Sequence, residues 1–258
     1  MGVGKGIRGV NIEYHKLWSR QLNQDMEFKV YGETGKPVII FPTQGGRFFQ
    51  FEDFGMIQAI APLIEAGAYQ VFTVDSVDNQ SWANWNILPP ERAKRHEDYD
   101  RYITHEMVPY IHDRMATKPL LLAAGCSMGG YHSANFFFRH PDLFDSLVSL
   151  SGLFQLKMFV GGYMDDTVYF NSPLHYLRNL QDPWYLDKYR RSHIIICAGQ
   201  GAWEEAMNAD IDVLRQILEE KHVPAWIDLW GHDVNHDWPW WRKQMPYFLE
   251  KLTQEKDV

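Results

Sequence analysis

The chain has 258 residues, a formal net charge of −8 at pH 7 and 45% hydrophobic residues. This length suits one sizeable domain, since α/β folds of this size commonly form a single core. The acidic balance leaves no broad basic surface for nucleic acid or an anionic membrane, so we expect neither as a partner. A small neutral or hydrophobic molecule is the expected partner. The composition gives no information on the oligomeric state.

The N-terminus and the cysteines bear on where the protein works. Residues 1–9 carry positive charge but no apolar run behind it, and so lack the layout of a signal peptide. No stretch of apolar residues is long enough to span a bilayer. Cys126 and Cys197 both lie in apolar runs, which favours buried thiols over a disulfide. We therefore expect a cytoplasmic protein.

The first part of the chain predicts antiparallel strands that lead into buried ones. Residues 11–31 alternate polar and apolar side chains, as strands with one face in water do. Residues 32–35, Gly-Glu-Thr-Gly, predict a hairpin turn. Residues 37–41 form a short all-apolar run, typical of a strand covered on both faces, and residues 69–74 predict a second such strand. The apolar spacing over 54–66 predicts a helix between them.

The middle of the chain continues the alternation of helix and strand. Pro89-Pro90 can open a helix, because proline is tolerated in a first turn, and apolar positions between Tyr99 and Ile111 keep one face of it buried. The apolar run from Leu120 predicts a strand, followed by a helical pattern over 131–138 and another strand over 146–150.

The last third contains an irregular segment and three further predicted elements. Residues 153–191 have no clear period but carry many aromatic side chains, so we expect a lid-like insertion over one end of the sheet. Strands over 193–198 and 225–230 flank a helix through Leu214, and a final helix covers 241–252.

This order of elements predicts the fold class. Strands alternating with helices indicate an α/β protein with a mostly parallel central sheet, helices on both faces and antiparallel strands at the N-terminal edge. We expect residues 1–258 to form a single domain. In such sheets ligands bind at the carboxyl ends of the strands.

Gly125-x-Ser127-x-Gly129 lies between the apolar run and the helical pattern. Small residues two positions before and after the serine let a sharp turn close around it in strained backbone geometry. The strand-turn-helix setting is what a nucleophile elbow requires, which favours it over an ordinary glycine turn. Ser127 is the predicted nucleophile, and the backbone N–H of Met128 is a predicted donor to an acyl oxyanion.

A serine hydroxyl is a weak nucleophile unless a base takes its proton. The elbow therefore predicts a carboxylate and then a histidine further along the chain. The loop after strand 193–198 offers Glu204 and Glu205, and the loop after strand 225–230 offers His232 and His236. The expected order of serine, carboxylate and histidine is therefore present. The choice between Glu204 and Glu205, and between His232 and His236, stays open.

The same C-terminal segment suggests a metal site as an alternative. His232 and His236 would share a helix face at a spacing of four, with Asp233 and Asp237 beside them. However, the segment lacks an H-E-x-x-H motif, follows a predicted strand and has no evident third ligand. We therefore expect no metal, and no cofactor is implied.

Three motifs carry a resemblance to a known family. Residues 125–130 (Gly-Cys-Ser-Met-Gly-Gly), 140–144 (His-Pro-Asp-Leu-Phe) and 236–241 (His-Asp-Trp-x-x-Trp) resemble the esterase family of α/β-hydrolases that includes S-formylglutathione hydrolases, feruloyl esterases and mycobacterial mycolyltransferases. The likeness runs from about Val38 to Leu249 and implies the α/β-hydrolase fold. In that family the final histidine precedes x-Trp, which implies His236 as the base.

The resemblance also implies the acid and the second oxyanion donor. The family's carboxylate follows the penultimate strand shortly before an apolar position, which favours Glu204 over the runner-up Glu205. The second N–H comes from the loop after the early strand, where Gly46 is the preferred donor and Gly45 and Gln44 are the alternatives. This loop departs from the H-G-G-G pattern of many lipases.

These observations predict a serine esterase that cleaves a carboxylic ester through an acyl-enzyme, with a Ser-His-Glu triad and a small-molecule ester as substrate. Trp82, Trp203 and Trp238 are expected to wall the substrate pocket. An acyltransferase that passes the acyl group to a sugar or alcohol is one alternative. A catalytically silent ligand-binding homologue is another, although all three triad residue types occur at their expected loops.

Overall fold

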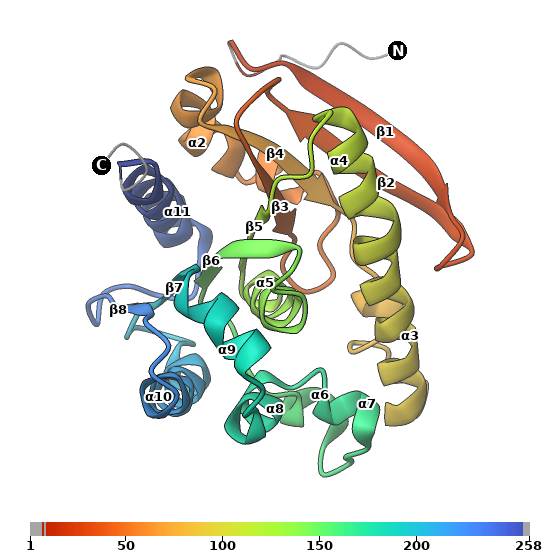
Figure 1. Ribbon diagram of the computed structural model, residues 1–258, viewed down its shortest axis with the longest axis vertical. Helices are drawn as coiled ribbons and strands as arrows, with labels where there is room; N and C mark the ends of the chain where they lie inside the picture. Colours follow the sequence, from red (N-terminus) through yellow and green to blue (C-terminus); the bar gives the residue numbers. More distant parts are fainter. Residues whose placement is uncertain (1–6, 8, 255–258) are drawn as a thin grey trace.

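One sheet organises the molecule. A computed structural model of the protein describes residue 7 and residues 9–254 and shows an eight-stranded sheet with helices on both faces (Figure 1). The strand order is β1-β2-β4-β3-β5-β6-β7-β8. Neighbours from β4 to β8 in this order pair in parallel, whereas β1 and β2 join antiparallel at one edge. The predicted fold class is therefore confirmed. The expectation that the N-terminus is not a signal peptide concerns residues 1–9, of which 1–6 and 8 lie outside the described residues.

The elements lie close to the predicted ranges. The strands are β1 (Ile12–Ser19), β2 (Gln24–Tyr31), β3 (Lys36–Phe41), β4 (Tyr69–Val74), β5 (Leu121–Cys126), β6 (Phe144–Leu150), β7 (His193–Ala198) and β8 (Trp226–Leu229). The helices are α1 (Gln50–Asp53), α2 (Met56–Glu65), α3 (Pro89–Tyr102), α4 (Val108–Arg114), α5 (Met128–Arg139), α6 (Lys157–Val160), α7 (Asp166–Tyr169), α8 (Pro173–Asn179), α9 (Pro183–Arg190), α10 (Glu205–Glu220) and α11 (Trp238–Gln254).

The turn over residues 32–35 is not a hairpin, contrary to the prediction. β2 and β3 do not pair with each other, because each pairs with a different side of β4. The chain leaves β2, passes over the start of β4 and enters β3 beyond it. Gly35 has a φ of +107°, and a Cβ there would lie 2.5 Å from the backbone of Ala68. This turn therefore needs glycine because it crosses closely over the neighbouring strand.

The single helix predicted from Pro89 onwards is interrupted. α3 passes through a π-helical turn, Ile103–Met107, before it continues as α4. Pro109 lies in the first turn of α4 and has no N–H to donate to the carbonyl of residue 105. The change of helical period at this point accommodates that missing bond.

Helices cover the sheet in two groups. On one face, Ile60 of α2 and Phe248 of α11 belong to one buried apolar cluster. On the other face, Tyr99 of α3, Phe136 of α5 and Leu214 of α10 belong to a larger one. The sheet is therefore buried on both sides, as its apolar strands predict. Cys126 and Cys197 are buried free thiols, which confirms the expectation for them.

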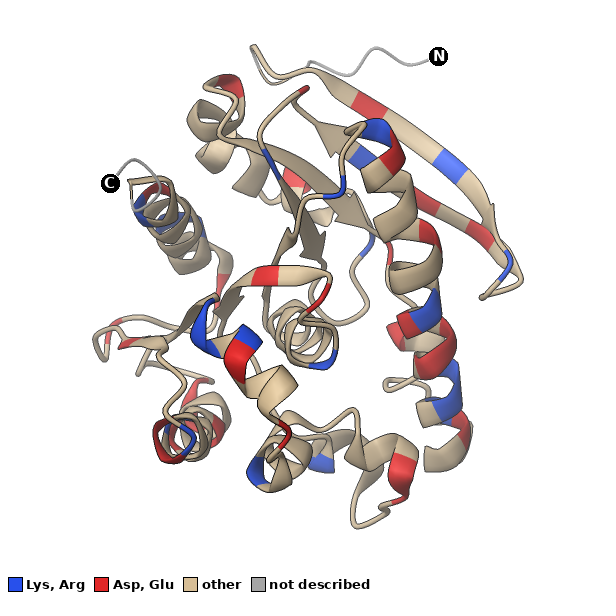
Figure 2. Ribbon diagram, viewed as in Figure 1, with Lys and Arg blue, Asp and Glu red and all other residues tan. Residues whose placement is uncertain are grey.

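The segment 153–191, for which no period was apparent, forms the four short helices α6 to α9. Among them, α7 packs against α3, and α8 packs against α5 and α10. Figure 2 shows Lys and Arg interleaved with Asp and Glu along α3 and α4. Within the described part of the chain, no helix combines the length and apolar character needed to cross a bilayer.

Candidate active site

Ser127 occupies a strained turn between β5 and α5. Its φ of +57° and ψ of −121° are unfavourable for a residue with a Cβ, and such strain is concentrated at functional sites. A Cβ on Gly125 would lie 2.3 Å from the carbonyl oxygen of Gly129, and one on Gly129 would lie 2.2 Å from that of Phe41. Both glycines of the motif are thus required by close backbone approach. The Ser127 N–H donates to the carbonyl of Leu150 at 2.8 Å, which fixes the turn on β6.

His236 approaches this serine from the loop after β8. Its Nε2 lies 2.8 Å from Ser127 Oγ, which is hydrogen-bonding distance. The backbone N–H of His236 donates to the carbonyl of Ala202 at 3.0 Å, and its ring meets that of Trp241 edge-on at 5.0 Å. The imidazole is therefore held from two sides. His232, by contrast, is exposed.

Glu204 and Glu205 have different environments. Glu204 is 1% exposed, and its Oε2 lies 3.4 Å from His236 Nδ1. Glu205 begins α10 and is exposed. The structure thus brings Ser127, His236 and Glu204 together in one chain of contacts, with the contact from histidine to carboxylate near the long limit for a hydrogen bond.

Two residues beside Glu204 were missed from the sequence. Ser151 follows β6, is fully buried and donates its hydroxyl to Glu204 Oε1 at 2.5 Å. Trp241 of α11 in turn donates its Nε1–H to Ser151 Oγ at 3.0 Å. The Gly199 N–H reaches the same Oε1 at 3.4 Å. The only signal in the sequence is a hydroxyl residue at the carboxyl end of the strand next to the elbow strand.

The loop after β3 holds the candidates for the second oxyanion donor. Gly46 N–H donates to the carbonyl of Thr43 at 2.8 Å and closes a turn, so it is not free for a substrate oxygen. Within the residues that the structure describes, the amides of Gln44 and Gly45 donate to no other group. The amide of the preferred candidate is thus engaged in this conformation, while those of the two alternatives are not. Gly45 has a φ of +67°, which favours glycine there.

Arg47 anchors this loop to the next strand. Its Nε lies 2.7 Å from Asp75 Oδ1, and the same oxygen accepts the Phe48 N–H at 3.1 Å. Burial raises the pKa of Asp75, and the hydrogen bond from Arg47 opposes that rise. Arg47 also pairs with Glu27 at 2.5 Å. Its charge is thus already compensated by two carboxylates.

Met128 heads α5, where first-turn N–H groups have no partner inside the helix. Its side chain belongs to a buried apolar cluster with Trp82 and Phe159. Trp82 is fully buried and cannot contact a bound substrate in this conformation. Trp238 is 8% exposed and stacks on Phe54, with 4.7 Å between ring centroids. Of the three predicted tryptophans, only Trp203, which is 80% exposed beside Glu204, offers its ring to solvent.

Among residues 7 and 9–254, no group of three or more His, Cys, Asp or Glu side chains is arranged to hold a metal ion.

The strand order and the elbow are those of the α/β-hydrolase fold, and the family match below supports an enzyme of the serine hydrolase superfamily. The chain belongs to the family described as putative esterase, whose model matches residues 19–252. This agrees with the resemblance in the sequence motifs and supports ester hydrolysis as the general reaction. No curated protein sequence is similar enough to this chain to be matched.

Solved structures agree with this fold. A ferulic acid esterase has a TM-score of 0.75 at 17% identity, covering 95% of this chain and 98% of that one. An S-formylglutathione hydrolase from Agrobacterium tumefaciens has a TM-score of 0.72 at 16% identity, covering 95% of each chain. MPT51 of Mycobacterium tuberculosis has a TM-score of 0.68 at 13% identity, covering 94% of this chain and 98% of that one. At these identities the likeness concerns the fold.

Proposed function

We propose that this protein hydrolyses a carboxylic ester through an acyl-enzyme on Ser127. The observation that carries the proposal is the 2.8 Å contact between Ser127 Oγ and His236 Nε2 at a strained elbow. As Oγ attacks the ester carbonyl, His236 accepts the hydroxyl proton. It then gives that proton to the departing alcohol, and a water molecule activated by the same histidine releases the acid.

Glu204 is the proposed orienting acid. Its Oε2 faces His236 Nδ1, so the carboxylate would accept a hydrogen bond from Nδ1–H, hold that tautomer and leave Nε2 unprotonated to act as the base. The developing oxyanion would receive the N–H of Met128 and that of Gly45 or Gln44. Preorganised donors of this kind contribute several kcal/mol to the transition state.

The segment 153–191 is proposed to shape the acyl side of the site. Leu156 and Phe159 belong to the same buried cluster as Met128, the residue after the nucleophile. Arg47 is already paired with Asp75 and Glu27, so its charge is not available to select an anionic substrate. The pairing of Arg47 favours a neutral ester.

Hydrolysis of p-nitrophenyl acyl esters tests the proposal. Wild-type protein should release p-nitrophenol, and Ser127→Ala should abolish that release while the protein stays folded. Unchanged turnover in folded Ser127→Ala would refute the role of Ser127. Glu204→Gln should lower kcat about 10³-fold or more, since triad carboxylates have effects of this order. Glu205→Gln is the matched control and should leave kcat unchanged.

The acyltransferase alternative makes a different product. If a sugar or an alcohol resolves the acyl-enzyme, adding such an acceptor should divert the acyl group into a new ester without lowering p-nitrophenol release. Product analysis by mass spectrometry separates the two reactions. A catalytically silent homologue would release no p-nitrophenol above the Ser127→Ala background.

A further inference from the structure

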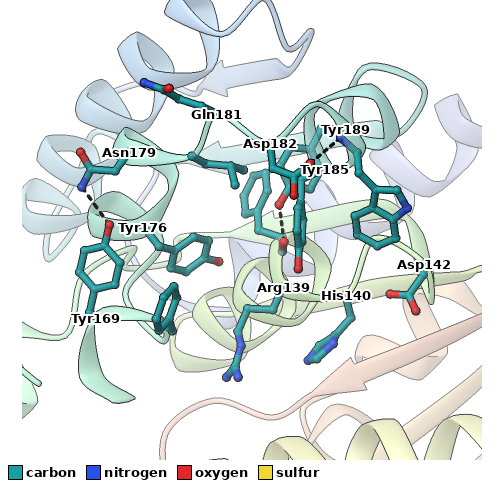
Figure 3. Close-up of a pocket in the computed structure, with 14 residues that line it drawn as sticks. Arg139, His140, Asp142, Tyr169, Tyr176, Asn179, Gln181, Asp182, Tyr185 and Tyr189 are labelled. Carbon is teal, nitrogen blue, oxygen red and sulfur yellow. Dashed lines mark hydrogen bonds between the residues drawn. The ribbon is translucent and has the colours of Figure 1, made fainter. Parts of the chain in front are cut away.

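A cavity lies at the end of α5 that is remote from the nucleophile. It has a volume of about 680 Å³ and is lined by the C-terminal end of α5 together with residues of α8 and α9 (Figure 3). Ser127 directly precedes α5 and Arg139 ends it, so this 12-residue helix separates the two by about 18 Å at 1.5 Å per residue. A cavity of this size is in the range of small-molecule sites. It is distinct from the candidate active site.

Aromatic rings form much of its wall. Figure 3 shows several of them gathered around one space, and the aromatic lining residues are Phe138, Tyr169, Phe170, Tyr176, Trp184, Tyr185 and Tyr189. Two of the tyrosines are fixed by hydrogen bonds, since the Tyr169 hydroxyl accepts from Asn179 Nδ2 at 2.9 Å and Tyr189 donates to the carbonyl of Phe138. Phe170 and Trp184 are about half exposed. The rings are therefore positioned by the protein, while part of their surface is open.

The two basic lining residues are already paired. Arg139 Nη1 lies 2.8 Å from Glu97 Oε1 and 3.3 Å from Asp100 Oδ2. His140 Nε2 lies 2.9 Å from the same Asp100 oxygen. Burial alone would raise the pKa of Asp100, but the hydrogen bond from His140 and the charge of Arg139 outweigh it and hold that pKa below its ordinary value. Neither basic lining residue therefore has an uncompensated charge to offer an anion.

The two acidic lining residues have no such partners. Asp142 and Asp182 are exposed, and among the described residues neither forms an ion pair. Asp182 Oδ1 accepts only the backbone N–H of Trp184, at 2.9 Å. The cavity therefore combines aromatic faces with two carboxylates whose charge is not neutralised, in a chain of net charge −8.

We propose that this cavity binds a small organic cation, an ammonium group carried on an apolar body. An ammonium within about 6 Å of an aromatic centroid is attracted by the ring face, and the attraction grows as the group is desolvated. The carboxylates of Asp142 and Asp182 add a Coulombic attraction that an uncharged ligand would not feel. Lys188 shows the same chemistry outside the lining, because its Nζ lies 5.0 Å from the Trp184 ring centroid. This binding site is independent of the proposed esterase activity.

Calorimetric titration with choline tests the proposal. The uncharged isostere 3,3-dimethyl-1-butanol has the same shape, so the two ligands differ in charge alone. Performed on Ser127→Ala protein, the titration should give an affinity for choline at least tenfold higher than for the isostere. Trp184→Ala and Asp182→Asn should each weaken choline binding at least threefold, and Trp184→Phe should retain most of it. Asparagine at 182 still accepts the Trp184 N–H, so the start of α9 is preserved.

Asp187→Asn is the matched control. It removes one negative charge from the same helix, at an exposed residue that pairs with Arg190 and does not line the cavity, and should leave choline binding unchanged. Thermal melts confirm that each variant is folded. Equal affinity for choline and the isostere, no binding of choline, or binding insensitive to both Trp184→Ala and Asp182→Asn would each overturn the proposal. Binding of cellobiose without binding of choline would assign the cavity to neutral sugars and would overturn it too.

Discussion

Replacing Ser151 with alanine removes one hydroxyl that holds the proposed triad acid. That hydroxyl donates to Glu204 Oε1 at 2.5 Å inside a fully buried pocket. Hydrogen bonds to charged groups contribute about 1.5–3 kcal/mol. The Gly199 N–H, 3.4 Å from the same oxygen, remains after the substitution. We therefore take the lower end, about 1.5–2 kcal/mol, which corresponds to a fall in kcat of about 10- to 30-fold.

Steady-state hydrolysis of a p-nitrophenyl ester measures this effect. KM should change less than twofold, because Ser151 contacts the acid and not the substrate pocket. Trp241→Phe keeps a ring beside His236 but loses the Nε1–H to Ser151, so it should lower kcat by a smaller factor. The double variant should be no slower than Ser151→Ala, since Trp241 Nε1 acts through the missing hydroxyl.

Backbone strain needs its own control, because Ser151 has a φ of +51°. Ser151→Gly relieves that strain and also removes the hydroxyl, so it should be as slow as Ser151→Ala. A wild-type kcat in Ser151→Ala would refute the reasoning. So would a double variant whose loss of kcat equals the product of the losses in Ser151→Ala and Trp241→Phe.

Three further predictions concern stability. His96 is fully buried with both ring nitrogens unpartnered, and burial holds its pKa well below the ordinary value. Because only the unfolded state gains a proton below about pH 6.5, the free energy of unfolding should fall by about 2 kcal/mol from pH 7 to pH 5. Denaturant melts of His96→Phe should lack this loss. Gly129→Ala places a Cβ 2.2 Å from the Phe41 carbonyl and should lower Tm by about 4–8 °C, whereas Gly162→Ala, with open space around it, should melt as wild type. Because the pKa of Asp100 is depressed, its pairing stabilises the fold above the unfolded pKa of about 3.9, and this stabilisation is lost as pH falls through the folded value. Asp100→Asn should therefore be less stable than wild type at pH 7 and lose less stability on acidification. Identical acid profiles of the two proteins would contradict this.

The sheet was predictable because its strands are buried on both faces. Leu121 and Ala123 of β5 face one core cluster, while Leu122 and Ala124 face the other. Apolar side chains at every position make such a strand visible in the sequence. The order of strands in the sheet could not be predicted in the same way, because β3 and β4 are both apolar and either could lie beside β2. The error at residues 32–35 has this origin.

The candidate site divides in a similar way. Ser127 follows from a local motif, and the rule that loops at the carboxyl ends of strands meet predicts a glutamate and a histidine beside it. The choice of Glu204 and His236 within their pairs rests on the family resemblance. Ser151 and Trp241 are 90 residues apart, and only the packing of α11 on the sheet makes them neighbours. Gly46 looked like a free donor because the turn that engages its N–H depends on loop conformation. Apart from the hydroxyl residue that follows β6, contacts of these two kinds leave no signal in a single sequence.

Mass spectrometry of the intact protein after reaction with a fluorophosphonate tests the central claim most directly. A serine activated by His236 should take up one phosphonyl group, the labelled peptide should contain Ser127, and Ser127→Ala should remain unmodified. A folded wild-type protein that takes up no label, or a Ser127→Ala variant labelled to the same extent, would contradict the assignment of Ser127 as the nucleophile.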